Sequence, residues 1–497
     1  MKPVSNKIAA LLLTAALGTA SLPLAVPTAH AAGAHALAPL SAQEIQEAVS
    51  ELARLGVMQG YTDRSMGAHN QINRAELAKM VVKALHLEGT AQTPAKLTDM
   101  QPNSWAYQYA SELVGLGIMQ ADGGRFDPAG TVTDDELVQI VSKALKRDVK
   151  SVQYWMERFY SAGQAATRGE VAYLLKTAQK AIPSEKAKIT SVQSLNAITL
   201  IVTFDAPLTA ADEAFDKAKV DFSFNDGLTL TNLPRLKTGS IATYIVPTSV
   251  QKPGVTYTLT YKGKQAGTFT GNATKLQMNE SRQVTNDTFE IEALKSDNVT
   301  DYGYVISAYS AGRGENAFVL DANNRANGTT YQIISSMQAR QVTITPAGGQ
   351  PIVAKYVPFT QSTDGKQEPK FRLPEGQVLA PGVTYTVSSD WATIKNPTFV
   401  AKEIAPVEIA AAEALSDTSI AVTLTEDPGD ELFSGRSVEL TADHGEKLLA
   451  TYKYSSRKGA VGIFDLQQGG KLSAGTAYTV TPVGDWAGDS QAKLTVE

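Results

Sequence analysis

The chain has 497 residues, a formal net charge of −5 at pH 7 and no cysteine. The lack of cysteine excludes disulfides, thiolate metal sites and a cysteine nucleophile, and the mild acidity argues against a nucleic-acid partner, which needs basic residues to neutralise phosphates. The length predicts three or more domains, and a hydrophobic content of 43% is enough to give each domain a core.

The first 31 residues have the organisation of a secretory signal peptide. Lys2 and Lys7 precede an apolar run over residues 8–20, and the Ala-His-Ala sequence at 29–31 fits a signal-peptidase site. We expect cleavage after Ala31, which makes the mature chain more acidic. No later apolar run reaches the roughly 18 residues of a membrane span. The sequence therefore predicts a secreted protein whose attachment to a surface depends on binding.

A repeated helical unit follows the signal peptide. Residues 51–59 return as residues 112–120 with the shared pattern Glu-Leu-x-x-Leu-Gly-x-Met-Gln. A short loop leads from each copy to a four-residue motif, which a third copy shares: residues 73–76 (Asn-Arg-Ala-Glu), 133–136 (Thr-Asp-Asp-Glu) and 167–170 (Thr-Arg-Gly-Glu). Each motif predicts a capping box that satisfies free N–H groups at a helix start. The sequence thus predicts a helix, a loop and a second helix, repeated.

The repeat resembles the S-layer homology domain, a module of about 50–60 residues by which bacterial surface proteins bind the cell wall. The middle copy is the most similar, with Leu-Thr-Asp at 97–99, Trp105 and Asp-Gly-Gly-Arg-Phe-Asp-Pro at 122–128. The first copy lacks the tryptophan, and the third keeps Trp155 but has lost most of its loop. The resemblance extends over residues 41–182 and divides into repeats at about 41–89, 95–148 and 149–182.

Two arginines stand at the first helical position of their motifs, Arg74 and Arg168. A cation there faces the positive end of the helix dipole and costs a few tenths of a kcal/mol. In the S-layer homology family such a basic residue contacts the secondary cell wall polymer, often at a pyruvate ketal. A guanidinium pairs well with a carboxylate, and helix N–H groups beside it add to the attraction. The resemblance therefore implies polymer binding, and the alternative is a solvated surface charge.

The middle repeat departs from the family at this position. It has Asp134 and Asp135 where a basic residue is expected, and these acids favour the helix start but repel an anionic polymer. We expect the groove that depends on them to be silent. Replacing Asp134 by arginine is expected to cost a few tenths of a kcal/mol of stability and to raise polymer affinity.

Three further residues complete the candidate polymer-binding set. Trp105 fits a core position and a sugar-contacting wall equally well, because aromatic faces serve both uses. Gly123 and Gly124 are most simply turn residues of the loop in the middle repeat.

Beyond residue 183 the hydrophobic pattern changes from helical to alternating. Apolar residues at 198, 200, 202 and 204 predict a half-buried strand, and the pattern returns at 289–293 and 420–424. A closing motif, Lys-Pro-Gly-Val-Thr-Tyr-Thr-Leu at 252–259, is matched at 380–387 and 473–480. We interpret its tyrosines as strand-packing residues. The layout resembles the bacterial immunoglobulin-like modules that follow S-layer homology anchors, with domains at 183–272, 273–404 and 405–497.

Catalytic and metal sites find little support. The histidines have no motif partner, although a Ser/His/Asp site is assembled by folding and spacing does not exclude it. Acidic runs at 297–301 and 426–431 have hard oxygen ligands suited to Ca²⁺, but neither has the EF-hand spacing, and solvated acidic turns are the favoured interpretation. Ca²⁺ is the one cofactor that the sequence suggests, and no metal site is assigned.

The sequence thus predicts a multidomain protein, with an all-α S-layer homology region followed by three all-β immunoglobulin-like sandwiches. We expect a non-enzymatic S-layer protein at the cell surface. It would be bound noncovalently to anionic, pyruvylated secondary cell wall polymer or another peptidoglycan-associated glycan, and would self-associate into a two-dimensional lattice. The alternative is an anchored adhesin or glycan- or protein-binding protein that forms no lattice. Ordered sheets in electron microscopy would distinguish the two.

Overall fold

The computed structural model describes residues 37–293, 319–326, 328–358, 368–428 and 433–496. The predicted signal peptide and the acidic run at 297–301 lie outside the described residues. None of the helices in these ranges is both long enough and apolar enough to cross a membrane.

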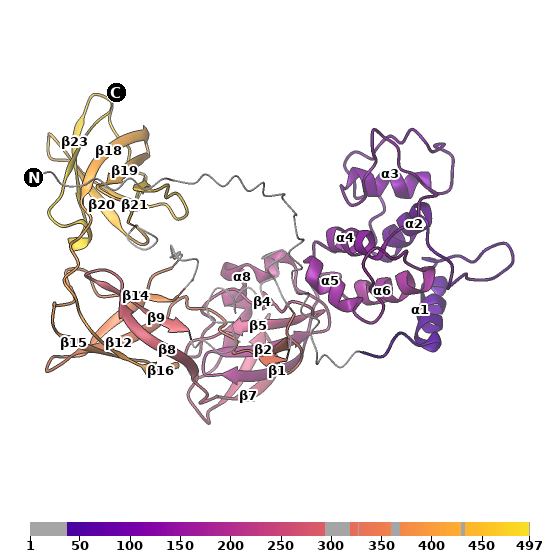
Figure 1. The fold of residues 1–497 in the computed structure, drawn as a ribbon, viewed down its shortest axis with the longest axis horizontal. Coiled ribbons are helices and arrows are strands. Elements are labelled where there is room, and N and C mark those ends of the chain that lie inside the picture. Colours follow the sequence, from indigo (N-terminus) through magenta and orange to yellow (C-terminus); the bar gives the residue numbers. More distant parts are fainter. Residues whose placement is uncertain (1–36, 294–318, 327, 359–367, 429–432, 497) are drawn as a thin grey trace, which may run out of the picture. The chain divides into compact units, whose positions relative to one another are not determined.

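The N-terminal region is helical, as the repeat predicts. Its helices are α1 (Ala42–Arg54), α2 (Arg74–Ala84), α3 (Tyr107–Gly115), α4 (Asp134–Leu145), α5 (Val149–Trp155) and α6 (Arg168–Gln179), coloured indigo to magenta in Figure 1. The three predicted capping boxes are confirmed at the starts of α2, α4 and α6, and Ser41 with Glu44 forms another at α1. Apolar residues from Ala48 to Ala178 make one continuous core, so the repeats share a single interior.

The segments that precede α2, α4 and α6 meet one another. Isolated β-bridges pair Gln71 with Thr167, Asn73 with Thr131, and Thr133 with Ala165. Each segment therefore contacts the other two, and the three bridges close a triangle. This closed arrangement places each helix start beside the loop of a different repeat.

From residue 189 the described residues form mainly β-strands, and the first part of this stretch also contains two short helices. There, β1 (Ile189–Asn196), β2 (Thr199–Phe204), β5 (Thr243–Pro247) and β4 (Arg235–Leu236) form one sheet in that order. A second sheet has the order β3 (Phe222–Phe224), β6 (Thr256–Tyr261) and β7 (Lys264–Thr270), with α7 (Ala210–Glu213) and α8 (Phe215–Asp221) preceding it in the chain. Ile198, Leu200, Val202 and Phe204 are buried as predicted, but Thr199 on the other face is buried too, so this strand is covered on both faces at that end.

The second β-region is one eight-stranded sheet. Its order is β16 (Ala392–Asn396), β8 (Leu276–Gln283), β9 (Thr288–Ala293), β14 (Lys370–Arg372), β13 (Ile352–Tyr356), β12 (Gln341–Pro346), β15 (Thr384–Ser388) and β17 (Thr398–Val400). A separate pair joins β10 (Arg325–Ala326) and β11 (Thr329–Thr330). Phe289 and Ile291 are buried as predicted, but Glu290 and Glu292 between them are buried too. The polar side of β9 is therefore covered, and Lys370 lies 3.3 Å from Glu290.

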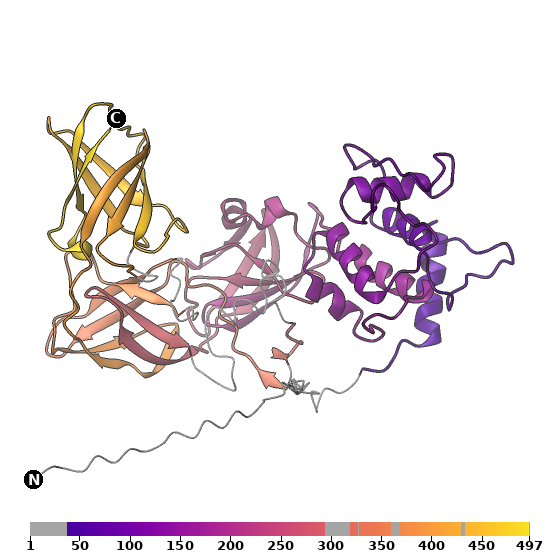
Figure 2. The same ribbon diagram turned by 45° about the horizontal axis from the view of Figure 1, so that its top comes forward.

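The third β-region is a seven-stranded sheet that curls on itself. Its order is β18 (Ile409–Ser416), β19 (Ser419–Leu424), β22 (Val461–Leu466), β21 (Lys447–Tyr452), β20 (Ser437–Ala442), β23 (Ala477–Pro482) and β24 (Ala492–Thr495), with a 3₁₀ turn η2 (Asp485–Ala487) before β24. The edge strands β18 and β24 lie next to each other, and Figure 2 shows the strands around a common interior. The protein is thus multidomain, helical first and all-β afterwards. That its β-regions are three immunoglobulin-like sandwiches stays a prediction.

The closing motif has the same local structure in all three β-regions. It begins with a turn in which a glycine adopts positive φ: +75° at Gly254, +80° at Gly382 and +75° at Gly475. The tyrosine that follows is buried, and its hydroxyl accepts a backbone N–H from the residue five positions earlier. The pairs are Tyr257 with Lys252 (2.9 Å), Tyr385 with Ala380 (2.9 Å) and Tyr478 with Ser473 (3.1 Å). The tyrosines therefore pack in the core, as predicted, and also fasten the turn.

Candidate ligand-binding groove

Arg168, at the start of α6, is almost wholly buried against the first repeat. Its side chain is 4% exposed, and its Nη1 donates to Glu76 Oε1 at 2.7 Å. Nη2 donates to the carbonyl of Gln59 at 2.7 Å and Nε to that of Met66 at 3.2 Å. The guanidinium also lies 4.7 Å from the centre of the Tyr61 ring. These contacts stabilise a cation at the positive end of a helix, where it would otherwise be unfavourable.

Arg74, at the start of α2, makes the same contacts with the second repeat. Its Nε donates to the carbonyl of Phe126 at 2.8 Å and its Nη2 to that of Gln120 at 2.7 Å. Nη1 lies 3.7 Å from Glu136 Oε1, and the side chain is 14% exposed. Both arginines therefore brace the loop of a neighbouring repeat and bond or approach the glutamate of its capping box.

Asp134, at the start of α4, reverses this polarity. Its Oδ2 accepts the N–H of Ser161 at 2.8 Å, and the adjacent Asp135 accepts the N–H of Gly163 at 2.8 Å and the hydroxyl of Tyr160. The loop of the third repeat thus offers donors to an acid, where the other two loops offer carbonyls to an arginine. Asp134 is 3% exposed, and this burial raises the pKa of its carboxyl.

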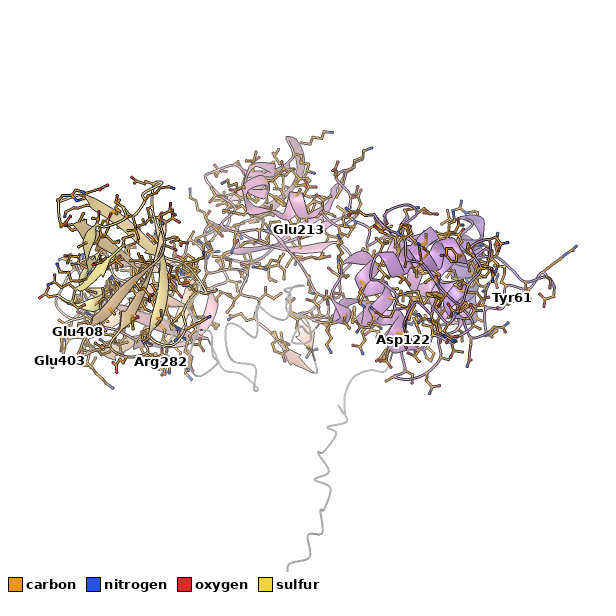
Figure 3. The ribbon with its side chains drawn as sticks, turned by 90° about the horizontal axis from the view of Figure 1, so that it is seen from above. Tyr61, Asp122, Glu213, Arg282, Glu403 and Glu408 are labelled. Atoms are coloured by element: carbon orange, nitrogen blue, oxygen red, sulfur yellow. The ribbon has the colours of Figure 1, made fainter. Side chains whose placement is uncertain are left out.

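A groove of about 320 Å³ opens beside Arg168. Trp105 forms part of its wall and is 58% exposed, so its placement in the core is excluded. Lys79 of α2 also lines the groove, with its Nζ 5.7 Å from the centre of the Trp105 ring and 2.6 Å from Gln59 Oε1. The lining residues are Val57, Met58, Gln59, Gly60, Tyr61, Glu76, Lys79, Met80, Trp105 and Arg168, of which Tyr61 is marked in Figure 3. We call this the first groove.

The first groove is positively charged and contains an aromatic face. Burial lowers the pKa of Lys79, and repulsion from Lys83 and Arg168 lowers it further. An anion that entered the groove would relieve this repulsion. The exposed ring of Trp105 offers a flat surface of the kind on which sugar rings pack. The arrangement can therefore hold an acidic saccharide.

The structure brings together only some of the residues predicted for this role. Arg168 and Trp105 line the first groove, whereas Arg74, Gly123 and Gly124 are not among its lining residues. The two glycines form a two-residue hairpin between Asp122 and Arg125, with φ of +55° and +86°. Such a turn needs positive φ at both central positions, which agrees with their interpretation as turn residues.

The sequence analysis missed Gln59, Tyr61 and Lys79. Tyr61 donates its hydroxyl to Glu76 at 3.2 Å and lies under the Arg168 guanidinium. Lys79 follows the capping-box glutamate by three residues, a position that places it on the same face of α2. That spacing is a signal that could have been used, but lysines on helices are usually solvated.

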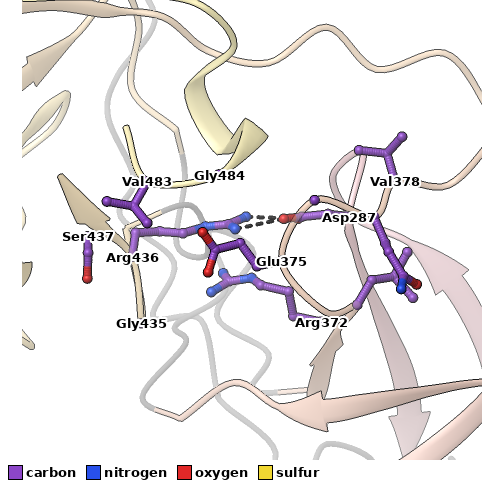
Figure 4. A pocket seen from close by; sticks show the side chains of 12 residues that line it. Asp287, Arg372, Glu375, Val378, Gly435, Arg436, Ser437, Val483 and Gly484 are labelled. Carbon is purple, nitrogen blue, oxygen red and sulfur yellow. Dashed lines mark hydrogen bonds and ion pairs between the residues drawn. The ribbon is translucent and has the colours of Figure 1, made fainter. Parts of the chain in front are cut away.

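A second, smaller cavity is less suited to an external ligand. It has a volume of about 150 Å³ and lies between the second and third β-regions, where Arg436 donates to both carboxylate oxygens of Asp287 at 2.7 and 2.8 Å (Figure 4). Its main charges already pair with each other. Within the described ranges, no group of three or more His, Asp or Glu side chains is placed to hold a metal ion. The acidic run at 426–431 is described only to residue 428, so the Ca²⁺ prediction stays open.

Two segments of the helical region, which carry part of this groove, match a known family model. The S-layer homology domain matches residues 39–78 and 96–133, which include α1, the start of α2 and all of α3. The middle cell wall protein of Brevibacillus brevis is 25% identical over 304 residues, which cover 57% of this chain and 28% of that protein. The S-layer protein sap of Bacillus anthracis is 27% identical over 146 residues, covering 29% and 17% respectively. The chain therefore spans less than a third of the length of these relatives.

Among solved structures, the surface layer protein SbsC (domains 1–6) is 13% identical and is covered to 73%, with 92% of this chain aligned. The TM-score is 0.14, which is too low to support an argument about fold. The family match and the named relatives nevertheless define the class: the chain carries the S-layer homology domain and is similar to S-layer proteins. The names of these relatives place them in the cell wall or in the surface layer.

Proposed function

We propose that this protein is an S-layer structural protein whose helical region binds secondary cell wall polymer noncovalently. The β-regions, which we take to be immunoglobulin-like sandwiches, form the surface lattice in this proposal. The observation that carries it is the first groove, in which Arg168, Lys79 and the exposed ring of Trp105 face one cavity.

The groove suits an acidic sugar for three reasons. The ring of Trp105 provides a packing surface for a pyranose, and Lys79 is a cation that a carboxylate can reach. Arg168 is already bonded to Glu76, so it contributes mainly a positive wall and fixes the Gln59 carbonyl in place. A pyruvate ketal on an amino sugar combines the carboxylate and the ring that these groups require. The ligand in this proposal is therefore a pyruvylated polymer.

Sedimentation with purified cell walls tests the anchoring half. Residues 37–182 have their own core, so this fragment and residues 37–497 are both suitable. Both should pellet with pyruvylated walls and remain in solution with walls stripped of pyruvate. Lys79→Ala or Trp105→Ala should weaken binding about tenfold, equal to about 1.4 kcal/mol. Lys143→Ala, which removes an exposed lysine from α4, is the matched control and should bind normally.

Electron microscopy tests the lattice half. The chain without residues 1–31 should form ordered two-dimensional sheets, and a comparison with and without Ca²⁺ would reveal any calcium dependence. Wall binding without sheets would favour the anchored adhesin instead.

A further inference from the structure

The three repeats differ at the positions that equip the first groove. The loop of each repeat is contacted by the first residue of a helix from another repeat. This residue is Arg168 at the loop of the first repeat, Arg74 at that of the second and Asp134 at that of the third. The residue three places after the capping-box glutamate also changes. It is Lys79 in α2, Gln139 in α4 and Tyr173 in α6. The pairing of an arginine with a lysine thus occurs only at the first repeat.

The sequence suggested Trp155 as the residue of the third repeat that corresponds to Trp105. The structure indicates a different residue. Trp105 lies two residues before α3, whereas Trp155 is the last residue of α5, so the two tryptophans are not equivalent. The residue two places before α5 is Arg147. Arg147 therefore has the same position relative to α5 as Trp105 has relative to α3.

Arg147 and Trp155 both form hydrogen bonds with the first β-region. Arg147 Nη2 donates to the carbonyls of Ser240 and Ile241, the second at 3.3 Å, and Trp155 Nε1 donates to that of Gly239 at 2.8 Å. The guanidinium lies 5.5 Å from the centre of the Trp155 ring. Three consecutive carbonyls of the loop between β4 and β5 are thus held by side chains of the helical region.

The same loop is held by a buried acceptor. The N–H of Gly239 donates to Ser151 Oγ at 2.7 Å, and that hydroxyl donates to Asp148 at 2.7 Å. Gly239 has a φ of +82°, and a Cβ there would lie 2.5 Å from Val319 and 3.1 Å from Tyr154. This position therefore requires glycine both for its backbone conformation and for the close approach of Val319 and, less tightly, of Tyr154 in α5.

We propose that the second repeat has lost its ligand groove to a rigid joint, in which Arg147, Ser151 and Trp155 fix the anchor to the first β-region. The first groove is then the single polymer site of the chain, a statement that rests on the proposed function. The joint itself does not depend on it. One polymer contact would thereby set the direction in which the β-regions leave the wall.

Two measurements on the chain without residues 1–31 test the halves separately. Calorimetry with a pyruvylated polymer fragment should give one site per chain, with an affinity that falls about tenfold in Trp105→Ala and stays within twofold in Trp155→Phe. The joint is followed by the distance between spin labels at Gln46→Cys and Lys264→Cys, which are unique because the chain has no cysteine. Trp155→Phe, Trp155→Ala and Gly239→Ala should broaden that distance distribution, and Trp105→Ala should leave it unchanged.

The outcomes separate the two ideas. Two sites per chain would overturn the single-site statement. No binding at all would instead overturn the proposed function, and the distance measurement would still decide on the joint. An unchanged distribution in Trp155→Phe and Gly239→Ala would overturn the joint. Trp155→Phe keeps an aromatic ring at this position and removes the N–H that bonds Gly239, so it serves if the alanine variant does not fold.

Discussion

At the scale of single residues, the first helical position of each repeat is matched to what the neighbouring loop presents. Arginine meets carbonyls and a glutamate, and aspartate meets N–H groups. The helix dipole alone ranks these residues wrongly, because it ignores partners from another repeat. Arg168 is unusual in the sequence because a cation at a helix start is unfavourable. Its partner Glu76 is 92 positions away, and no local pattern connects the two residues.

We predict that Arg168→Ala lowers the free energy of unfolding by about 3 kcal/mol, because it leaves Glu76 without its buried partner. Arg74→Ala should cost less, about 1–2 kcal/mol, since its glutamate is 3.7 Å away and more exposed. Urea denaturation of residues 37–182 provides the comparison. Equal, negligible losses in both variants would mean that the loops hold their shape without the arginines.

The expectation for Asp134→Arg needs revision in the light of its burial. The variant loses the acceptor for the Ser161 N–H and places a cation in a closed site, so we predict a loss of about 1–3 kcal/mol with no gain in polymer affinity. Thermal melting and wall sedimentation provide the two readings. A gain in affinity with a small stability loss would restore the simple dipole account.

Asp134→Asn separates burial from charge. The folded-state pKa of Asp134 is raised above its unfolded value, so its ionisation costs stability, increasingly as pH rises through and above about 4. Asparagine keeps an acceptor for Ser161 and removes the charge, so this variant should melt higher than the wild type at pH 7 and not at pH 3. A lower melting temperature at pH 7 would contradict the burial argument.

At the scale of elements, local signals specified most of what the sequence predicted. Capping boxes and apolar alternation each depend on a few adjacent residues, and both are present in the structure. The burial of Glu290 and Glu292 was not predictable in this way, because the strand pattern cannot show what covers its polar face. The first groove was not predictable for the same reason. Lys79 has the sequence pattern of an ordinary helix lysine, and its contact with Trp105 is formed only by folding.

The closing tyrosines offer an element-scale prediction that can be repeated three times in one chain. Replacing Tyr257, Tyr385 or Tyr478 by phenylalanine removes the acceptor for a turn N–H and keeps the packing, so each should cost about 1–2 kcal/mol in its own β-region. Tyr454→Phe, at an exposed position, is the control. If differential scanning calorimetry shows no shift in melting temperature for any of the three variants, the tyrosines stabilise their β-regions by packing alone.

At the scale of the whole molecule, a buried ion pair links the second and third β-regions. Burial acts to raise the pKa of Asp287, but hydrogen bonds and charge from Arg436 overcome this and hold the pKa at about 2. Arg372 reinforces the link by donating to the Ser434 carbonyl at 2.6 Å. Because the folded-state pKa is lowered, this stabilisation is present above about pH 4 and is lost as pH falls towards 2.

We predict that Asp287→Asn separates the third β-region from the second, at a cost of about 3–5 kcal/mol for removing the carboxylate that pairs with the buried Arg436. In calorimetry at pH 7 the second and third β-regions should unfold together in the wild type and separately in the variant, and the wild type should lose this coupling as the pH falls through about 2. Asp417→Asn breaks an exposed pair with Lys471 and should change nothing. An unaltered single transition in Asp287→Asn would remove the pair from any role in coupling.

The triangle of β-bridges has a consequence for how the helical region can evolve and be engineered. An open solenoid can gain or lose repeats at its ends, because each repeat contacts only its neighbours. Here Gln71 of the first repeat pairs with Thr167 of the third, so the ring has no end at which a unit could be added. Deleting any one repeat removes two of the three junctions at once. Three is therefore the number of repeats that closes the ring. Enlarging the helical region would need a second complete ring in tandem.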